Sequence, residues 1–255
     1  MLFLNIMLTK KCSLKCKGCM NMSNNLFDKE DYDLNLFEND IKHLSSLNIN
    51  FDHLILIGGE PFELDNLKNY ILIIYKYINK KIYIHTNGLR LLSFKDLDIL
   101  RNVTIRITKY SIFKSYYFKL EKFLQENNIK YEYHNPQPFF KDDRDEFYRM
   151  RTTVEEHFDS AENYKKCINK CPYLFNSKLY SCPIAMTACT RNKYFGTNYP
   201  EEYININDIR SQNDFENILK PIDLCKFCTN TEDSLYKHMI NAKIIKDDYI
   251  CDNIV

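Results

Sequence analysis

The sequence predicts an α/β fold in which helices cover a parallel sheet and a cysteine-rich segment follows. Short apolar runs rich in β-branched residues alternate with stretches of helical period over the first half of the chain. A length of 255 residues suffices for one large α/β domain with a small appendage. Seven of the ten cysteines lie at or after Cys167, where strand and helix signals are short, so we expect a metal to hold this part together.

The elements follow from the spacing of apolar residues. Five strands are predicted, at residues 3–8, 53–57, 82–86, 103–108 and 129–133. Helical period indicates helices at residues 67–78 and 113–124 and, more weakly, at 37–44. Ser93 and Asp96 predict a further helix that opens with a capping box. Parallel strands end at a common edge, so we expect one rim to collect the segments that follow them, at residues 12–19, 58–61, 86–88 and 108–111.

Three parts are predicted along the chain. Residues 1–140 hold the strand–helix units, residues 141–166 a connector and a helix, and residues 167–255 the cysteine-rich part. The alternating pattern fails from His134 onward, and the first boundary is placed just before a charged run at residues 141–146.

Charge and targeting signals argue against several classes of function. The formal net charge is +1, so no global field directs the chain to nucleic acid or to a membrane, and we expect neither as a partner. The N-terminus has no basic leader and no small-residue cleavage site. Ten cysteines without an export signal favour metal ligation over disulfides and predict a cytoplasmic location.

Cys12, Cys16 and Cys19 form the first motif, in the loop after the first predicted strand. Three thiolates without a nearby fourth suit a metal or cluster that keeps one position open for a ligand. The cysteines alone leave a zinc knuckle or a chance grouping open.

A second motif follows the next strand and consists of Gly58, Gly59, Glu60 and Pro61. The glycines allow the backbone to approach a ligand closely, and the carboxylate can accept hydrogen bonds from an ammonium group. Together, the C-x3-C-x2-C and Gly-Gly-Glu-Pro motifs resemble the radical SAM superfamily. That resemblance implies a partial, TIM-like (β/α) barrel of about six strand–helix units, and a 4Fe–4S cluster whose fourth iron binds S-adenosylmethionine (SAM). It also implies that residues 58–61 hold the amino end of that cofactor.

The same resemblance assigns roles to the next two strand ends. Thr86 and Asn87 would line the cofactor site, and Thr108 and Ser111 would contact SAM. Small and β-branched residues are also ordinary at strand ends, which is the alternative. Many family members carry an aromatic residue before the third cysteine, whereas this chain has Gly18, so adenine contacts must come from elsewhere.

The C-terminal part offers a second set of thiols. Cys171 and Cys182 flank a predicted turn and short strand, and Cys225 and Cys228 form a distant C-x2-C pair. Four such thiolates suit zinc as well as iron. Other assignments stay open: Cys167 in place of Cys171, Cys189 in place of Cys182, with Cys251 spare.

This tail resembles the Twitch (abbreviated SPASM-like) auxiliary-cluster domain of radical SAM dehydrogenases that act on aminocyclitols. The resemblance implies a single auxiliary 4Fe–4S cluster, reductive cleavage of SAM to a 5′-deoxyadenosyl radical, and two-electron oxidation of a small polar, sugar- or cyclitol-like substrate. The auxiliary cluster would accept the substrate's electron, and a flavodoxin- or ferredoxin-like protein would supply the first one. Arg149 and Arg151 are the candidate catalytic residues, as proton acceptor or hydroxyl clamp, although charges in this segment could equally form a solvated face.

Two other functions remain possible on sequence. A peptide- or protein-modifying radical SAM enzyme would often carry a leader-binding domain, for which we expect no room before Cys12. A metal-binding or electron-transfer protein without SAM chemistry would not need residues 58–61 at a strand end.

Overall fold

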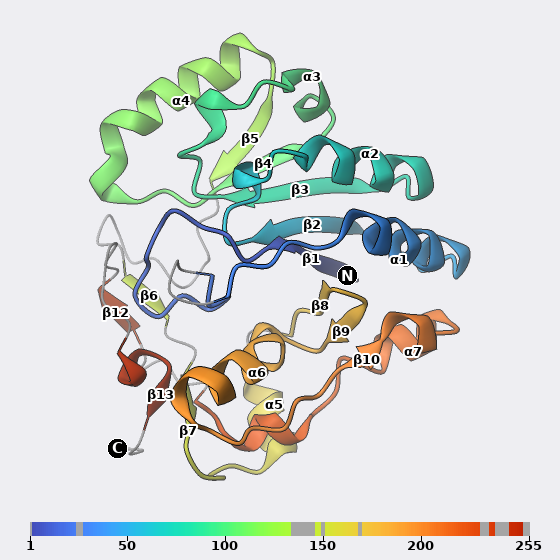
Figure 1. The fold of residues 1–255 in the computed structure, drawn as a ribbon, viewed down its shortest axis with the longest axis vertical. Helices are drawn as coiled ribbons and strands as arrows, with labels where there is room; N and C mark the ends of the chain where they lie inside the picture. Colours follow the sequence, from blue (N-terminus) through green and yellow to red (C-terminus); the bar gives the residue numbers. More distant parts are fainter. Residues whose placement is uncertain are drawn as a thin grey trace.

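The computed structural model describes residues 2–23, 28–133, 146–148, 151–167, 170–229, 235–237 and 245–251. Its main sheet has eight strands in the order β10-β9-β8-β1-β2-β3-β4-β5 (Figure 1). The five predicted strands are confirmed as parallel neighbours in chain order: β1 (Phe3–Thr9), β2 (His53–Gly58), β3 (Lys81–Thr86), β4 (Thr104–Ile107) and β5 (Lys130–Tyr133). Their carboxyl ends lie at one edge, beside the blue loop that follows β1 (Figure 1).

Three predicted helices are confirmed, namely α1 (Leu34–Ser46), α2 (Leu67–Tyr77) and α4 (Lys114–Glu126). Their apolar faces are buried with the strands in one core. The predicted capping box is wrong. Ser93 donates its hydroxyl to the Arg90 carbonyl (2.8 Å) within a 3₁₀ turn, and Asp96 makes no side-chain cap bond to the single turn of α3 (Leu97–Leu100).

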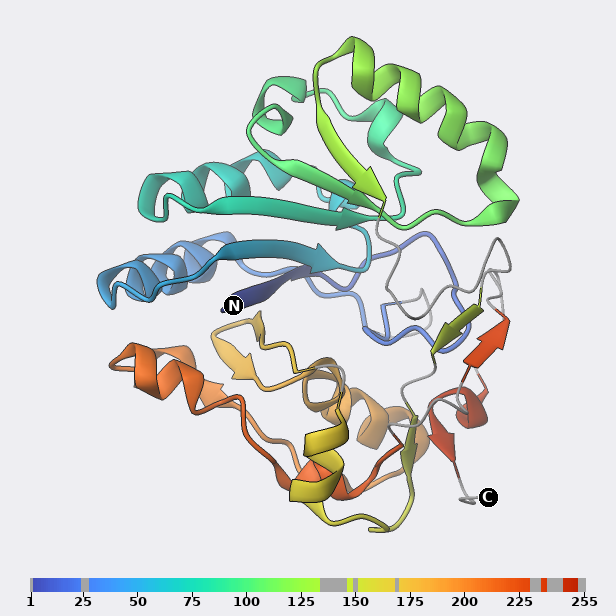
Figure 2. The ribbon, with the colours of Figure 1, turned by 180° about the vertical axis from the view of Figure 1, so that it is seen from behind.

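The main sheet continues into the C-terminal part of the chain. Strand β8 (Tyr173–Phe175) pairs in parallel with β1 on the side away from β2, and β9 (Lys178–Tyr180) and β10 (Ile204–Asn205) follow as antiparallel neighbours. The predicted turn is confirmed, because Asn176 and Ser177 join β8 to β9 with φ of 47° and 60°. Figure 2 shows this later half of the chain beyond β1. The fold is therefore α/β with a mostly parallel sheet, while the domain boundaries stay a prediction.

The remaining elements surround the later cysteines. They are the helices α5 (Ser160–Lys166), α6 (Pro183–Phe195) and α7 (Gln212–Glu216), a sheet of β11 (Cys228–Thr229), β7 (Arg151–Thr153) and β13 (Ile250–Cys251), and a pair of β12 (Leu235–Lys237) with β6 (Glu146–Tyr148). Among the residues that the structure describes, no helix is long and apolar enough to cross a membrane.

A buried polar network fastens the β8–β9 turn to α1. Asp40 accepts hydrogen bonds from the Tyr32 hydroxyl (2.5 Å) and the Ser177 hydroxyl (2.7 Å), and the Ser177 amide donates to Tyr32 (3.1 Å). Burial raises the pKa of the Asp40 carboxyl above its ordinary value of 3.8, and the two hydroxyl bonds oppose that rise.

This raised pKa predicts a pH dependence of stability. The folded carboxyl holds its proton more tightly than the unfolded chain does, so its contribution to stability is present below pH 3.8 and is lost as the pH rises through the folded pKa. Asp40→Asn should therefore flatten the decline of the unfolding free energy with pH above 3.8, measured by urea denaturation. The exposed Asp98 provides the matched control, since Asp98→Asn should leave that slope unchanged. A wild-type slope in the Asp40 variant would contradict the prediction.

Candidate functional site

The loop of Cys12, Cys16 and Cys19 is fastened to the end of β2. The Gly59 amide donates to the Thr9 carbonyl (2.8 Å), and the Glu60 amide to the Lys11 carbonyl (2.8 Å). The Asn21 side chain donates to the Gly58 carbonyl (2.9 Å). The predicted meeting of these two segments on one rim is confirmed.

The two glycines are needed for this contact. A Cβ on Gly59 would lie 2.1 Å from the Lys11 carbonyl oxygen and 2.9 Å from the Cβ of Cys12, and a Cβ on Gly58 would lie 2.4 Å from the Thr9 carbonyl oxygen. Backbone atoms cannot approach so closely past a side chain. The glycines that were expected to admit a ligand thus also bring the cysteine loop against the sheet.

Of the first three thiols, Cys12 is buried and Cys16 and Cys19 are partly buried. Burial and the nearby Cys19 thiol raise the pKa of Cys12 and of Cys16, and a hydrogen bond from Tyr110 to Cys16 opposes the rise. Burial also raises the pKa of Cys19, and hydrogen bonds from neighbouring backbone amides oppose the rise. Three thiolates this close need a bound cation to remain ionised together, so the donor set fits an iron–sulfur cluster.

Glu60 connects the ends of β2 and β3. Its fully buried carboxylate accepts hydrogen bonds from the Thr86 hydroxyl (2.6 Å), the Asn87 amide (2.8 Å) and the Phe62 amide (3.1 Å). Burial raises the pKa of Glu60 to about 7, and these three bonds oppose the rise. Both carboxylate oxygens therefore already accept bonds within the protein. That use was not visible in the sequence, and contact with the amino end of SAM stays a prediction.

The end of β4 joins the same rim. The Thr108 amide donates to the Thr86 carbonyl (2.8 Å), and the Tyr117 hydroxyl bonds the carbonyls of Asn87 (3.1 Å) and Thr108 (3.2 Å). Sequence reasoning missed Tyr110, which is buried with Cys12 between the predicted contacts Thr108 and Ser111. The side chain of Ser111 lies outside the described part of the structure.

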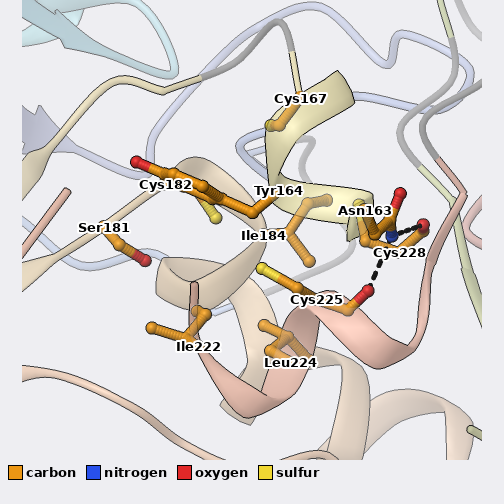
Figure 3. Close-up of a pocket in the computed structure, with 10 residues that line it drawn as sticks. All are labelled: Asn163, Tyr164, Cys167, Ser181, Cys182, Ile184, Ile222, Leu224, Cys225 and Cys228. Carbon is orange, nitrogen blue, oxygen red and sulfur yellow. Dashed lines mark hydrogen bonds between the residues drawn. The ribbon is translucent and has the colours of Figure 1, made fainter. Parts of the chain in front are cut away.

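A second site lies among α5, α6 and the β11 segment. Four thiols, those of Cys167, Cys182, Cys225 and Cys228, line one pocket together with Tyr164 and Asn163 (Figure 3). The predicted alternative that uses Cys189 is not favoured, because Cys189 is exposed and absent from the pocket lining.

The choice between Cys167 and Cys171 differs from the sequence preference. Cys171 does not line the pocket, although burial and the nearby thiols of Cys182 and Cys167 raise its pKa. The pocket therefore favours Cys167 as the fourth ligand, and the assignment of Cys171 stays an untested prediction.

Each pocket thiol is placed by the end of an element. Cys167 ends α5, and Cys182 begins α6, where its Sγ accepts from the Ala185 amide (3.4 Å). Cys225 lies in the 3₁₀ turn Asp223–Lys226, and Cys228 begins β11. Burial raises the pKa of Cys182 to about 11 and that of Cys228 further, and the neighbouring thiols add to both shifts.

Zinc and a 4Fe–4S cluster require different distances between their thiolate ligands. Four thiolates around one zinc lie roughly 3.8 Å apart, since each Zn–S bond is about 2.3 Å. No group of three His, Cys, Asp or Glu side chains in the described residues could hold a single metal ion as placed. The ligands of a 4Fe–4S cluster each bind a different iron and so stand farther apart than the ligands of one zinc ion.

Asn163 holds the C-x2-C turn and was missed from the sequence. Its side-chain amide donates to the carbonyls of Cys225 and Cys228, at 2.7 Å each (Figure 3). The residue lies on α5, one turn before Cys167. A single side chain thus ties the helix that carries one thiol to the turn that carries two others.

Loss of this amide should weaken the second site. Asn163→Leu leaves two partly buried carbonyls without their donor, which costs less than the roughly 1–3 kcal/mol of a fully buried group, so we expect lower stability and lower iron uptake at the second site after reconstitution. Asn127→Leu is the matched control: it removes an amide-to-carbonyl bond to Phe123 (2.8 Å) on α4, and its iron content should equal that of the wild type. Equal iron in both variants would contradict the role given to Asn163.

Of the two candidate catalytic arginines, only Arg151 can be placed relative to the second site. Arg149 falls outside the described residues. Arg151 begins β7, and its backbone pairs with Thr229, next to Cys228. The Nε of Arg151 is buried and makes no hydrogen bond within the described part of the chain.

Segment 245–251 touches both cysteine sites. Asp248 is buried and pairs with Lys17 (3.4 Å), which lies between Cys16 and Cys19. Two residues later, Ile250 pairs with Thr152 on β7, whose other neighbour is Cys228. The small sheet thus links the two sites.

Comparisons with known proteins agree with these observations. Residues 4–120 match a family model described as a 4Fe-4S single cluster domain, which supports the predicted cluster in the first part of the chain. No curated protein matches the sequence. A solved structure, BtrN in complex with AdoMet and 2-DOIA, has a TM-score of 0.53 and 16% identity, over 90% of this chain and 93% of that chain.

Two further solved structures match over about half of this chain. Streptococcus suis SuiB bound to S-adenosylmethionine has a TM-score of 0.43 and 20% identity, over 54% of this chain. Native anSMEcpe with bound AdoMet has a TM-score of 0.40 and 16% identity, over 52% of this chain. The chain spans 35% of the length of SuiB and 44% of that of anSMEcpe. The similarity to BtrN is one of fold over most of both chains, and it agrees with the fold that the predicted resemblance implies.

Proposed function

We propose that this protein is a radical SAM enzyme that oxidises a small polar substrate by two electrons, with an auxiliary 4Fe–4S cluster as the acceptor. One observation carries the proposal. A chain with the fold of BtrN has a three-cysteine loop on the sheet rim and, apart from it, a pocket lined by four thiols.

In the first site, Cys12, Cys16 and Cys19 would each bind one iron and leave the fourth iron to SAM. The Gly58–Gly59 contact fixes the loop, and the bonds of Glu60 to Thr86 and Asn87 fix the neighbouring strand ends. These contacts keep the protein groups in place before the cofactor binds, so little reorganisation is needed at the reaction step.

The bound cofactors would supply the radical chemistry: SAM with one electron would yield methionine and a 5′-deoxyadenosyl radical able to remove a hydrogen atom from the substrate's carbinol carbon. Conversion of that carbinol to a ketone would then release the hydroxyl proton to solvent and one electron to the auxiliary cluster. The protein would bind and orient the substrate and exclude water.

Arg149 and Arg151 remain the candidates for contact with the substrate hydroxyl. Support comes from Arg151, which lies on the strand beside Cys228 and has a buried Nε without a partner in the described structure. A guanidinium suits a hydroxyl clamp better than a base, because it stays protonated. A sugar- or cyclitol-like substrate fits such a clamp, and BtrN, which has this fold, was solved with AdoMet and 2-DOIA.

A flavodoxin- or ferredoxin-like protein is the proposed electron donor, and the cytoplasm the proposed location. We propose no nucleic-acid or membrane partner, in keeping with the net charge of +1.

Cleavage of SAM tests the proposal. The anaerobically reconstituted protein with dithionite and SAM should form 5′-deoxyadenosine and methionine in equal amounts, whereas the Cys12/Cys16/Cys19→Ala variant should form neither. The proposal would be overturned if wild-type protein with its full iron content formed 5′-deoxyadenosine no faster than this variant.

A further inference from the structure

Arg191 is the largest fully buried side chain in the described part of the chain, with 0% of its surface exposed. It lies on α6, the helix whose N-cap residue is Cys182. Burial of a charged group is costly unless nearby groups compensate for the charge. The position therefore needs an explanation in terms of what surrounds the guanidinium.

The guanidinium reaches toward the strand that pairs with Cys228. Its Nη1 donates to the Tyr249 carbonyl (2.7 Å) and the Thr152 hydroxyl (3.4 Å). Thr152 of β7 is the residue that faces Cys228 across the β7–β11 pair. Arg191 is thus connected to two pocket thiols: it shares a helix with Cys182 and bonds the strand partner of Cys228.

The electrostatic interactions agree with this placement. Burial lowers the pKa of Arg191. Several nearby groups oppose this lowering, among them Tyr199 and the thiols of Cys228 and Cys182. In turn, Arg191 opposes the rise in the pKa of Cys228. An arginine keeps its proton in proteins, so the site contains a fixed positive charge beside its thiolates.

Such a charge has a specific consequence for a cluster. A 4Fe–4S cluster with four thiolate ligands is anionic, and reduction by one electron adds one more negative charge. Net charge and hydrogen bonds near the ligands set the reduction potential of iron–sulfur clusters. A buried cation stabilises the reduced form more than the oxidised form, because it is little screened by solvent.

We propose that the positive charge of Arg191 raises the reduction potential of the auxiliary cluster and so enables it to accept the electron that the substrate loses. The inference rests on the proposed function, which supplies that electron: the substrate radical gives one electron to the cluster and its hydroxyl proton to solvent. Arg191 acts on the cluster through charge and touches neither the substrate nor SAM.

The test measures the midpoint potential of the auxiliary cluster by itself. The 255-residue chain with Cys12, Cys16 and Cys19 replaced by Ala is reconstituted anaerobically and titrated, with the reduced cluster followed by electron paramagnetic resonance. Arg191→Met should shift the equilibrium toward the oxidised form by about tenfold or more, which is about 59 mV for one electron. Arg191→Lys, which keeps the charge, should restore most of the potential.

A control and a second variant make the result decisive. Lys193→Met removes an exposed charge from the same helix and should leave the potential unchanged. Thr187→Asp places a carboxylate where the Thr187 hydroxyl now accepts from Arg191 Nε (3.4 Å), and it should lower the potential while the guanidinium stays. This variant decides the matter if Arg191→Met does not fold.

An unchanged potential in a cluster-loaded Arg191→Met or Thr187→Asp variant would overturn the inference and leave the proposed function intact. If the parent chain binds no second cluster, the proposed function fails, and the inference fails with it. Iron content before each titration separates the two cases.

Discussion

Gly59→Ala should abolish loading of the first cluster and reduce 5′-deoxyadenosine formation by more than about tenfold. The added Cβ would lie 2.1 Å from the Lys11 carbonyl oxygen and 2.9 Å from the Cβ of Cys12. Both neighbours belong to the cysteine loop, so the loop must move away from β2 and Cys12 with it. We expect a loss of about four irons per chain, with the auxiliary cluster retained, measured by iron and sulfide analysis after anaerobic reconstitution.

Gly196→Ala is the matched control for this substitution. A Cβ on Gly196 meets nothing within 4 Å, although its φ of +67° makes the change strained, at roughly 1–2 kcal/mol. The control should lower stability without loss of iron. The steric account would be wrong if Gly59→Ala kept the wild-type iron content and rate of SAM cleavage.

Loss of the second site should separate SAM cleavage from product formation. Cys228→Ser should remove the auxiliary cluster, with about four irons fewer per chain, because this thiol lines the pocket at the start of β11. The variant should still form 5′-deoxyadenosine, since the first cysteine loop is unchanged. Oxidised product should fall by at least about a hundredfold, because the substrate radical has lost its electron acceptor.

Two further cysteine variants sharpen this result. Cys167→Ser should behave as Cys228→Ser, and the exposed Cys189 should tolerate replacement by Ser without loss of iron. Cys171→Ser should keep the auxiliary cluster if the pocket lining identifies the ligands. Loss of iron in Cys171→Ser together with full iron in Cys167→Ser would reverse the assignment and support the preference drawn from the sequence.

The strands and the rim could be predicted because their signals are local. An apolar run such as Leu54–Leu56 is readable in a few residues, and strand ends in a parallel sheet meet wherever the intervening helices fit. Glycines after such a run indicate that another group approaches the backbone closely, but they do not identify that group. The structure shows that Gly59 packs against the Lys11 carbonyl and Cys12, which no spacing rule contains.

The second site was harder to predict, because its contacts join residues that are distant in sequence. Asn163 bonds carbonyls 62 and 65 residues later, and Arg191 reaches Tyr249 58 residues later. The alternatives Cys167 and Cys171 are both compatible with a ligand role by spacing, and only the end of α5 places Cys167 in the pocket lining. The capping box failed for a local reason, because the Ser93 hydroxyl bonds the carbonyl three residues before it.

Part of the C-terminal segment belongs to the core of the main sheet. Residues Tyr173, Leu174 and Phe175 enter that core, because β8 pairs with β1. A strand of three residues carries too weak a signal for its partner to be predicted.

The central claim is that one chain holds two clusters, and iron and sulfide analysis tests it most directly. After anaerobic reconstitution, the wild type should contain about eight irons and the Cys12/Cys16/Cys19→Ala variant about four. A wild type with about four irons, falling to near zero in the variant, would contradict the account, since the thiols of the second pocket would then hold no cluster and the substrate's electron would have no acceptor.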